Sequence, residues 1–113
     1  DIFISSRLVV DTGMNALGWN FERAQSFLRE NTLLSEIEIS SELLRYATDL
    51  PAQSLSYKLG SMKFAELRAK ARERLGSAFD LRRFHNRIVS NGGMPLSLVE
   101  AEIASFIDEH ARN

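Results

Sequence analysis

Residues that interrupt helices are scarce in this chain, and no other feature constrains its fold as much. The 113 residues include 2 prolines and 6 glycines, most of which fall between segments whose apolar residues recur every three or four positions. That spacing gathers apolar side chains on one face of a helix. We therefore predict an all-α fold of about six helices with short loops, forming a single helical domain around one core.

Capping signals set the expected helix boundaries. Ser35 with Glu38, and Ser97 with Glu100, have the spacing of capping boxes, in which the serine accepts a hydrogen bond from a free backbone N–H and the glutamate reaches back. Asp80 is expected to cap another helix. The predicted helices cover about residues 4–17, 20–31, 35–50, 51–75 and 80–90, and a last helix starts at about residue 97 and has His110 in its last turn.

The fourth predicted helix is the longest, and it carries two apolar stripes. One stripe consists of Tyr57, Gly60, Phe64, Leu67, Ala71 and Leu75, and the other of Leu55, Leu59 and Met62. Two stripes predict a central helix that packs on two sides in its first half. The second half is rich in arginine and lysine, so we expect that end to reach solvent.

Composition excludes several classes of function. With 14 Lys plus Arg against 15 Asp plus Glu, the net charge is -1, so the chain as a whole is not an electrostatic nucleic-acid binder. It has no cysteine, which excludes disulfides, thiolate zinc sites and cysteine nucleophiles. No apolar run is long enough to span a bilayer, so we expect no membrane partner.

Neither histidine has the spacing of a metal ligand. His85 and His110 lie on different predicted helices, and no HExxH-type motif is present. His85, between Arg83 and Arg87, is interpreted as a partly exposed helix residue. His110 lies in a last helical turn, where a cation suits the helix dipole. No metal site is predicted in this chain.

A group of polar residues follows the first capping box. Glu38 and Glu42 lie one turn apart, and Arg45 and Tyr46 come next. Paired acids beside Arg and Tyr could bind or polarise a carbonyl group. Spacing alone favours the simpler interpretation, a solvated helix face with an ordinary Glu42–Arg45 ion pair.

Nine of the 14 basic residues fall between Lys58 and Arg87. Arg82, Arg83 and Arg87 on one short helix could contact nucleic acid. Acidic residues are interleaved with them, and no aromatic residue is placed to stack on bases, so a solvated surface is the preferred interpretation. We expect nucleic acid to be an unlikely partner.

The triplet Asp11-Thr12-Gly13 interrupts an apolar segment. The same triplet occurs in aspartic proteases, but there it lies in a β-rich chain, so we reject the match. Asp11 is expected to face a polar group or solvent. Gly13 is expected to let another helix come close.

Several of these motifs together resemble a signature of the bacterial family of unknown function DUF885. The resemblance covers nearly the whole chain and corresponds to the C-terminal part of longer family members. The matching residues are Arg7 to Gly13 (RLVVDTG), Gly18-Trp19, Glu42-x-x-Arg45-Tyr46, Pro51-x-Gln53-x-x-x-Tyr57-Lys58-x-Gly60, Phe84-His85 and Asn91-Gly92-Gly93-x-Pro95-Leu96.

The resemblance implies a helical zinc metallopeptidase of the gluzincin type, whose metal motif lies upstream of this segment. By analogy with angiotensin-converting enzyme, Tyr46 would donate a hydrogen bond to the oxyanion formed during peptide hydrolysis. Arg45 would support Tyr46 or anchor a substrate carboxylate. Gln53 and Tyr57 would line the cleft. Zinc is thus implied for the longer family members, and no cofactor is expected in this chain.

The resemblance also implies roles for the first helix. Arg7 and Asp11 would form a buried pair that positions it. Many family members have His at the position of Asn15, so Asn15 is expected to face the cleft; many also have Arg at the position of Ile4. These differences suggest a fragment, or a lineage no longer selected for catalysis.

The leading hypothesis is therefore a C-terminal helical fragment resembling a DUF885 hydrolase, inactive alone because it brings no metal ligands. Its partner would be the missing N-terminal portion, and a peptide-like substrate would bind only in the full-length protein. The alternative is a free-standing interaction module that forms homo-oligomers, because the faces covered by missing helices must otherwise be hidden. A nucleic-acid binder ranks third. The compartment stays open between bacterial cytoplasm and periplasm.

Overall fold

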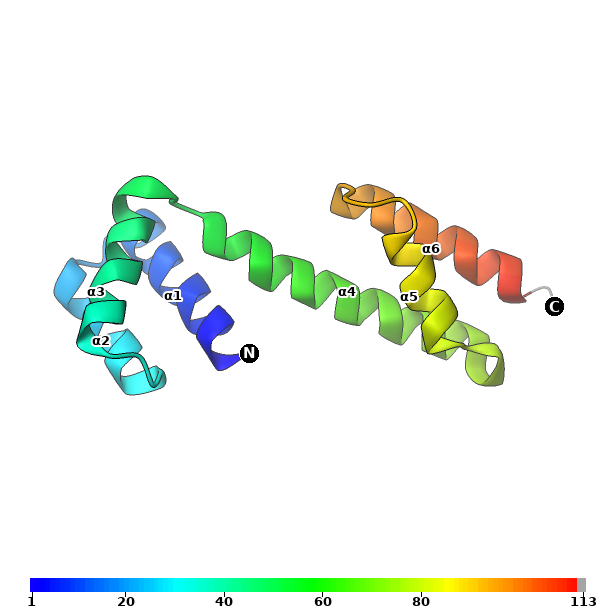
Figure 1. Ribbon diagram of the computed structural model, residues 1–113, viewed down its shortest axis with the longest axis horizontal. Helices are drawn as coiled ribbons and strands as arrows, with labels where there is room; N and C mark the ends of the chain where they lie inside the picture. Colours follow the sequence, from blue (N-terminus) through cyan, green and yellow to red (C-terminus); the bar gives the residue numbers. More distant parts are fainter. Residues whose placement is uncertain (112–113) are drawn as a thin grey trace. The chain divides into compact units, whose positions relative to one another are not determined.

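The computed structural model describes residues 1–111, and every regular element within them is helical (Figure 1). The all-α prediction is confirmed, and so is the long central helix. The elements in chain order are α1 (Ile2–Ala16), α2 (Phe21–Asn31), α3 (Glu36–Leu44), the π-helical turn η1 (Arg45–Asp49), α4 (Gln53–Leu75), the 3₁₀ turn η2 (Gly76–Ala78), α5 (Leu81–Val89) and α6 (Leu96–Ala111).

Three of the six α-helices in residues 1–111 start at the capping signals. Asn20 caps α2 by accepting a hydrogen bond of 2.9 Å from the Arg23 backbone N–H. The capping box of α3 is complete, with Ser35 and Glu38 each bonded to the other's backbone N–H. Asp80 caps α5 through two backbone N–H groups. Each cap joins residues two or three positions apart in the sequence, and such helix starts can therefore be predicted from the sequence.

Three starts differ from the prediction. α1 begins at Ile2, two residues before the expected start. α4 begins at Gln53 rather than at Pro51, because Pro51 and Ala52 form a turn in which Ala52 has a φ of 67°. α6 begins at Leu96, so Ser97 lies inside the helix and the second capping box is wrong. At α4 the left-handed conformation of Ala52 keeps Pro51 outside the helix. At α6 the Pro95 carbonyl accepts the first helical N–H bonds, from Leu98 and Val99, so the helix begins before Ser97.

The chain divides between Leu59 and Gly60 into two compact units. Where the pattern led us to expect one core, the described residues form two hydrophobic clusters, one in each unit. Unit 1 contains α1, α2, α3, η1 and the first residues of α4. Unit 2 contains the rest of α4, η2, α5 and α6.

In unit 1, helices α1, α2 and α3 and the turn η1 share a core (Figure 1). A Cβ at Gly13 would lie 2.5 Å from Cδ2 of Trp19, too close for any side chain. The close approach predicted at Gly13 is therefore made by the Trp19 ring rather than by a second helix. The fully buried members of this core are Val10, Ala24, Leu28, Ile39, Leu43 and Tyr46.

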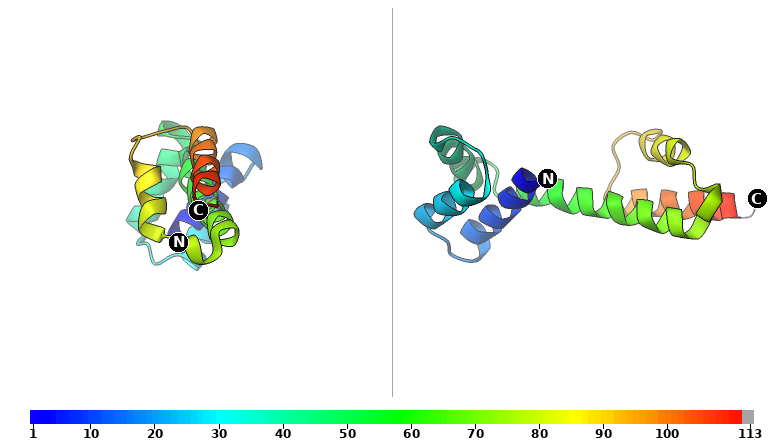
Figure 2. Two further views of the ribbon diagram at one scale, coloured as in Figure 1. Left: turned by 90° about the vertical axis from the view of Figure 1, so that its right-hand side faces the viewer. Right: turned by 90° about the horizontal axis from the view of Figure 1, so that it is seen from below.

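In unit 2, α5 and α6 pack against the second half of α4 (Figures 1 and 2). The buried members of this core are Leu67, Ala71, Leu75, Phe84, Val99, Ile103, Phe106 and Ile107. The apolar stripes in the first half of α4 lack this cover, since Tyr57, Leu59 and Met62 are each about half-exposed. Two-sided packing there is wrong for the described residues: a stripe shows which face is apolar, not what covers it.

Candidate functional site

A cluster of charged residues in unit 1 joins α1 to the end of α3. Arg7 projects from α1, Glu42 from α3, and Arg45 and Tyr46 from η1, which continues α3. The Arg7 Nε donates a hydrogen bond of 2.9 Å to the Tyr46 hydroxyl oxygen and lies 3.4 Å from Glu42 Oε2. The Tyr46 hydroxyl in turn donates to Glu42 Oε2. Arg45 Nη1 donates to the other Glu42 oxygen at 2.7 Å. We call these four residues the Arg7 cluster.

Burial sets the electrostatics of the Arg7 cluster. The side chains of Arg7 and Glu42 are only 12% and 16% exposed, and Tyr46 is 1% exposed. Burial, followed by the hydrogen bond to Glu42, raises the pKa of the Tyr46 hydroxyl well above its ordinary value. Tyr46 is therefore held as a protonated donor. Arg45, at 41% exposed, is the cation of the cluster that solvent reaches.

Aromatic rings surround the Arg7 guanidinium. Its central carbon lies 5.5, 5.6 and 5.4 Å from the ring centres of Phe3, Tyr46 and Tyr57. Its Nη2 is buried and makes no hydrogen bond within the described residues. Attraction between the guanidinium and the faces of the rings offsets part of the free energy lost with that missing hydrogen bond. Tyr57, on the first turns of α4, thus belongs to the surroundings of Arg7.

A second polar network is centred on Asp11, which is 1% exposed. Its Oδ1 accepts hydrogen bonds from Asn15 Nδ2 at 2.8 Å and from the Ala52 backbone N–H at 2.9 Å. Its Oδ2 accepts from the Ser54 hydroxyl at 2.5 Å. Asn15 Nδ2 also donates to the Tyr46 carbonyl at 3.1 Å. Asp11 therefore fastens the start of α4 to α1.

The pKa of the Asp11 carboxyl lies below its ordinary value. Burial alone would raise this pKa, but the hydrogen bonds from Ser54, Ala52 and Asn15 favour the charged form and outweigh burial. The carboxylate also holds Ala52 in its positive-φ conformation, which is strained for a residue with a side chain.

One hollow in unit 1 adjoins the Arg7 cluster through Glu42, and a second hollow lies next to the first. The first, of about 410 Å³, is lined by Phe3, Leu34, Ile37, Glu38, Ser41 and Glu42. The second, of about 570 Å³, is lined by Ile2, Phe3, Glu30, Asn31, Thr32, Leu33 and Leu34. They share Phe3 and Leu34. Glu42 is thus among the residues that line the first hollow, together with the apolar Phe3, Leu34 and Ile37.

Comparison with known proteins identifies the family. Residues 1–103 match the family described as "Bacterial protein of unknown function (DUF885)". This chain belongs to the DUF885 family. The resemblance seen in the motifs is thereby confirmed, and it covers nearly the whole chain. No curated protein sequence matched the chain.

A solved structure gives a close match for this DUF885 chain. It is the crystal structure of a protein from Colwellia psychrerythraea that is described as a candidate lipoprotein. The two are 38% identical, with a TM-score of 0.92 over 95% of this chain. The matched segment makes up 18% of the Colwellia chain, so the DUF885 chain spans less than a fifth of that relative.

The structure corrects the predicted pairing of Arg7 with Asp11. They lie one turn apart on α1, but Arg7 contacts Glu42 and Tyr46, whereas Asp11 contacts Asn15, Ala52 and Ser54. Each side chain finds a group brought to α1 by a different segment. Their separation along one helix gave no information about these partners.

Of the other residues predicted for the site, some contact the Arg7 cluster and some do not. The Glu42–Arg45 ion pair forms as expected. Glu38 does not share a role with Glu42, because its carboxylate caps α3 through Ser35. Gln53 lies half-buried in the first turn of α4, and within the described residues its side chain makes no hydrogen bond with the Arg7 cluster.

Sequence reasoning missed Phe3 and Ser54. Phe3 lies four residues before Arg7 on α1, a spacing that places two side chains on one helix face, so it could have been found. Ser54 had no such signal. Its hydroxyl matters only because the turn before α4 carries it to Asp11.

Zinc is implied by the family resemblance, but residues 1–111 do not offer a site for it. They contain no group of three or more His, Cys, Asp or Glu side chains able to hold a metal ion. The four-ligand geometry that zinc prefers therefore cannot be assembled from the described residues alone.

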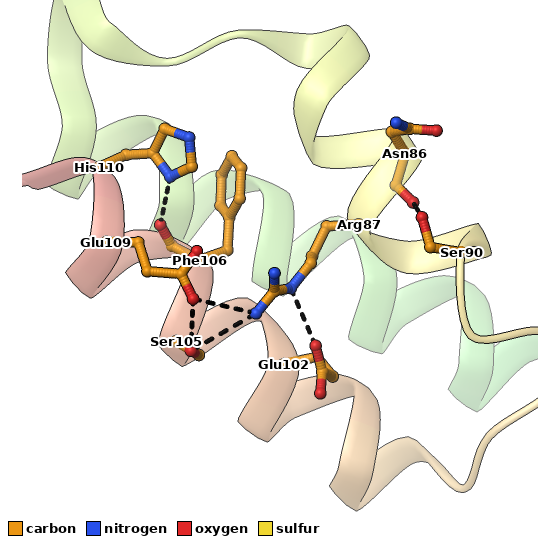
Figure 3. A network of polar contacts seen from close by, with 8 residues as sticks. All are labelled: Asn86, Arg87, Ser90, Glu102, Ser105, Phe106, Glu109 and His110. Atoms are coloured by element: carbon orange, nitrogen blue, oxygen red, sulfur yellow. Dashed lines mark hydrogen bonds and ion pairs between the residues drawn. The ribbon is translucent and has the colours of Figure 1, made fainter.

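One arginine of the basic helix α5 forms ion pairs with acidic residues of α6. Arg87 forms ion pairs with Glu102 at 2.9 Å and with Glu109 at 3.1 Å, and Ser105 also donates to Glu109 (Figure 3). On the same side of α6, His110 Nδ1 lies 2.8 Å from the Phe106 carbonyl oxygen (Figure 3). Arg87 is therefore neutralised within unit 2. Of the helices in residues 1–111, none is long and apolar enough to cross a membrane.

Proposed function

We propose that this DUF885 chain is the C-terminal helical part of a longer, zinc-metallopeptidase-like hydrolase and does not hydrolyse a substrate alone. The length of the Colwellia relative supports a longer protein, because the matched segment is only 18% of it. The metal would be held by residues outside this chain. The missing N-terminal portion would be the partner, and a peptide-like molecule would be the substrate.

The Arg7 cluster is the observation that carries this proposal. A buried ion pair adds little net stability, because the cost of removing both charges from water offsets their attraction. Arg7 and Glu42 are nevertheless kept mostly buried, beside a hollow of about 410 Å³ and an exposed Arg45. Such an arrangement is well suited to orient a polar substrate group.

Each residue of the cluster has a proposed role. Arg45 anchors a substrate carboxylate or carbonyl, and its bond to Glu42 orients it. Tyr46 keeps its proton and donates it in a hydrogen bond to the developing oxyanion, once its contact with Glu42 opens. Tyr57 and Gln53 line the substrate side of α4. Asn15 acts with Asp11 in positioning α4.

The test uses a longer DUF885 protein that contains this segment, assayed for peptide hydrolysis. Tyr46→Phe should cut turnover by about 10²–10³, because an oxyanion donor is lost. Arg45→Gln should raise KM for peptides with a free C-terminal carboxylate more than for the same peptides as amides. Arg29→Gln is the matched control, since the Arg29–Glu36 pair is exposed and lies outside the Arg7 cluster.

Two results would oppose the proposal. Unchanged turnover in Tyr46→Phe removes the oxyanion role. Absence of hydrolysis across a broad peptide panel in the metal-loaded longer protein removes the peptidase assignment itself. The 113-residue chain assayed alone is expected to show no hydrolysis.

Self-association is a second candidate function, favoured by one observation. Ile2, Leu33 and Ile37 are strongly exposed around the two hollows of unit 1, and Leu33 is fully exposed. Contiguous apolar surface of this kind marks an interaction face. In the isolated chain a second copy would cover it.

Light scattering over a dilution series tests this second function. A dimer that dissociates on dilution supports it, and Leu33→Asp should then shift the chain to monomer without unfolding it. Val89→Asp is the matched control, because Val89 is also exposed but lies on α5 in unit 2. A monomer at every concentration would exclude self-association through this face.

A further inference from the structure

A separate hollow lies in unit 2, between α4 and α5. Its volume is about 420 Å³, within the range of about 300–1,000 Å³ common for small-molecule sites. The residues from α4 follow helical spacing along one face, and so do those from α5. The lining residues are Ser61, Phe64, Ala65 and Arg68 on α4, and Phe84, His85 and Ile88 on α5.

The lining of this α4–α5 hollow combines an apolar floor with hydrogen-bond donors. Phe84 is buried at the base, and Ile88 is half-buried beside it. Arg68, His85 and Ser61 supply a guanidinium, an imidazole N–H and a hydroxyl. No Asp or Glu is among these lining residues, so no carboxylate in the lining competes with a ligand for these hydrogen-bond donors.

Arg68 lacks the ion pairs that Lys63 and Arg87 of unit 2 have. Lys63 lies 3.2 Å from Glu66, and Arg87 lies 2.9 Å from Glu102. Within residues 1–111, Arg68 forms no hydrogen bond or ion pair.

The sequence around Arg68 explains why it has no partner. The positions three and four residues away on α4 are Phe64, Ala65, Ala71 and Arg72, so no acid can pair with it on its own helix. Arg72 is itself a cation and adds positive potential. His85 likewise has no acid three or four residues away on α5.

We propose that the α4–α5 hollow binds a small amphiphilic carboxylate, such as the C-terminal end of a peptide with an apolar side chain. The carboxylate accepts hydrogen bonds from Arg68 and His85, and the guanidinium provides the stronger, charge-assisted contact. The apolar part lies against Phe64, Phe84 and Ile88. This site belongs to unit 2 and does not depend on the hydrolase proposed above.

The experiment is a titration of the 113-residue chain followed by NMR, with N-acetyl-L-leucine as the probe. Saturable shifts of backbone amide signals are expected in residues 61–68 and 84–88. N-acetyl-L-leucinamide, which has the same apolar part without the charge, should bind about tenfold more weakly. Acetate and inorganic phosphate should also bind more weakly, because they lack the apolar part.

Variants locate the site. Arg68→Gln should weaken binding of N-acetyl-L-leucine about tenfold, since one charge-assisted bond is lost. His85→Gln should weaken it about threefold, since one of the hydrogen bonds to the carboxylate is disturbed. Arg74→Gln is the matched control, because Arg74 is an exposed arginine of α4 outside the hollow, and it should bind like the unchanged chain.

Several outcomes would overturn the proposal. They are no saturable shift with N-acetyl-L-leucine, equal binding of the acid and its amide, or equal affinity in Arg68→Gln and Arg74→Gln. Phosphate binding as tightly as N-acetyl-L-leucine would show a simple anion site and would also exclude the amphiphilic ligand. None of these readouts involves hydrolysis, so they are independent of the proposed enzyme.

Discussion

Asp11→Asn tests whether one buried carboxylate holds α4 against α1. The carboxylate accepts hydrogen bonds from Asn15, Ala52 and Ser54 at 2.5–2.9 Å. An asparagine can keep the contacts to Asn15 and Ala52 through its oxygen, and its amide can donate to the Ser54 hydroxyl. What is lost is the negative charge of the group that accepts the three hydrogen bonds.

The size of the effect follows from this count. A hydrogen bond to a charged group contributes about 1.5–3 kcal/mol and a neutral one about 0.5–1.5 kcal/mol. The loss is therefore about 1 kcal/mol for each of three bonds, or about 3 kcal/mol of unfolding free energy. Domains of this size have about 5–15 kcal/mol in total, so the change is readily measured.

Urea unfolding followed by tryptophan fluorescence is the assay. Trp19, the single tryptophan of the sequence, packs in the core of unit 1 and reports on the unit that contains Asp11. Asp49→Asn is the matched control, because Asp49 is an exposed acid of η1 in the same unit, and its change should stay within about 0.5 kcal/mol. Equal unfolding midpoints for the two variants would refute the anchoring role of Asp11.

The stability difference between the unchanged chain and Asp11→Asn should also depend on pH. The pKa of Asp11 is lower in the folded chain than the ordinary value of about 3.9. A lowered folded pKa means that the charged carboxylate stabilises the fold above the unfolded pKa and that this stability is lost as the pH falls through the folded pKa. The difference between the unchanged chain and Asp11→Asn should therefore be constant near neutrality and shrink below about pH 4.

Two further predictions concern unit 1. Gly13→Ala should destabilise it by about 1–3 kcal/mol and shift the Trp19 emission, because the new Cβ displaces the ring. Gly60→Ala, at the first residue of unit 2, is the control: its Cβ meets nothing within 4 Å, so it should leave the Trp19 emission and the stability of unit 1 unchanged. The pKa of Tyr46 is raised in the folded chain, so the protonated hydroxyl stabilises the fold below the ordinary tyrosine pKa of about 10. This stabilisation is lost as the pH rises through the folded pKa. In Tyr57→Phe, ultraviolet absorbance should show the remaining tyrosine ionising only well above pH 10 or on unfolding; normal ionisation in the folded chain would contradict the buried contact with Glu42.

Much of the helical architecture was open to prediction, because it depends on neighbours in sequence. The caps at Asn20, Ser35 and Asp80 act on backbone N–H groups two or three residues away. Their side chains and the groups they bond belong to the same short segment. The motifs of the DUF885 signature could also be read directly, and the family match over residues 1–103 agrees with them.

The candidate site was predicted less completely. The motif singled out Arg7, Glu42, Arg45 and Tyr46, and the structure does gather them. It placed Arg7 with the wrong partner, however, because the bond between Arg7 and Tyr46 joins residues 39 positions apart. A periodic pattern shows which face of α1 is turned inward but not which segment meets that face.

Local sequence signals were thus enough to define the helices, most of their caps and the family. The tertiary fold was needed to show that Asp11 anchors α4, that the core divides into two clusters, and that Tyr57, Leu59 and Met62 in the first half of α4 stay exposed within residues 1–111. The physical reason is the range of the interactions. Capping and helical periodicity act within one or two turns, whereas burial and ion-pair partners depend on which distant segments pack together.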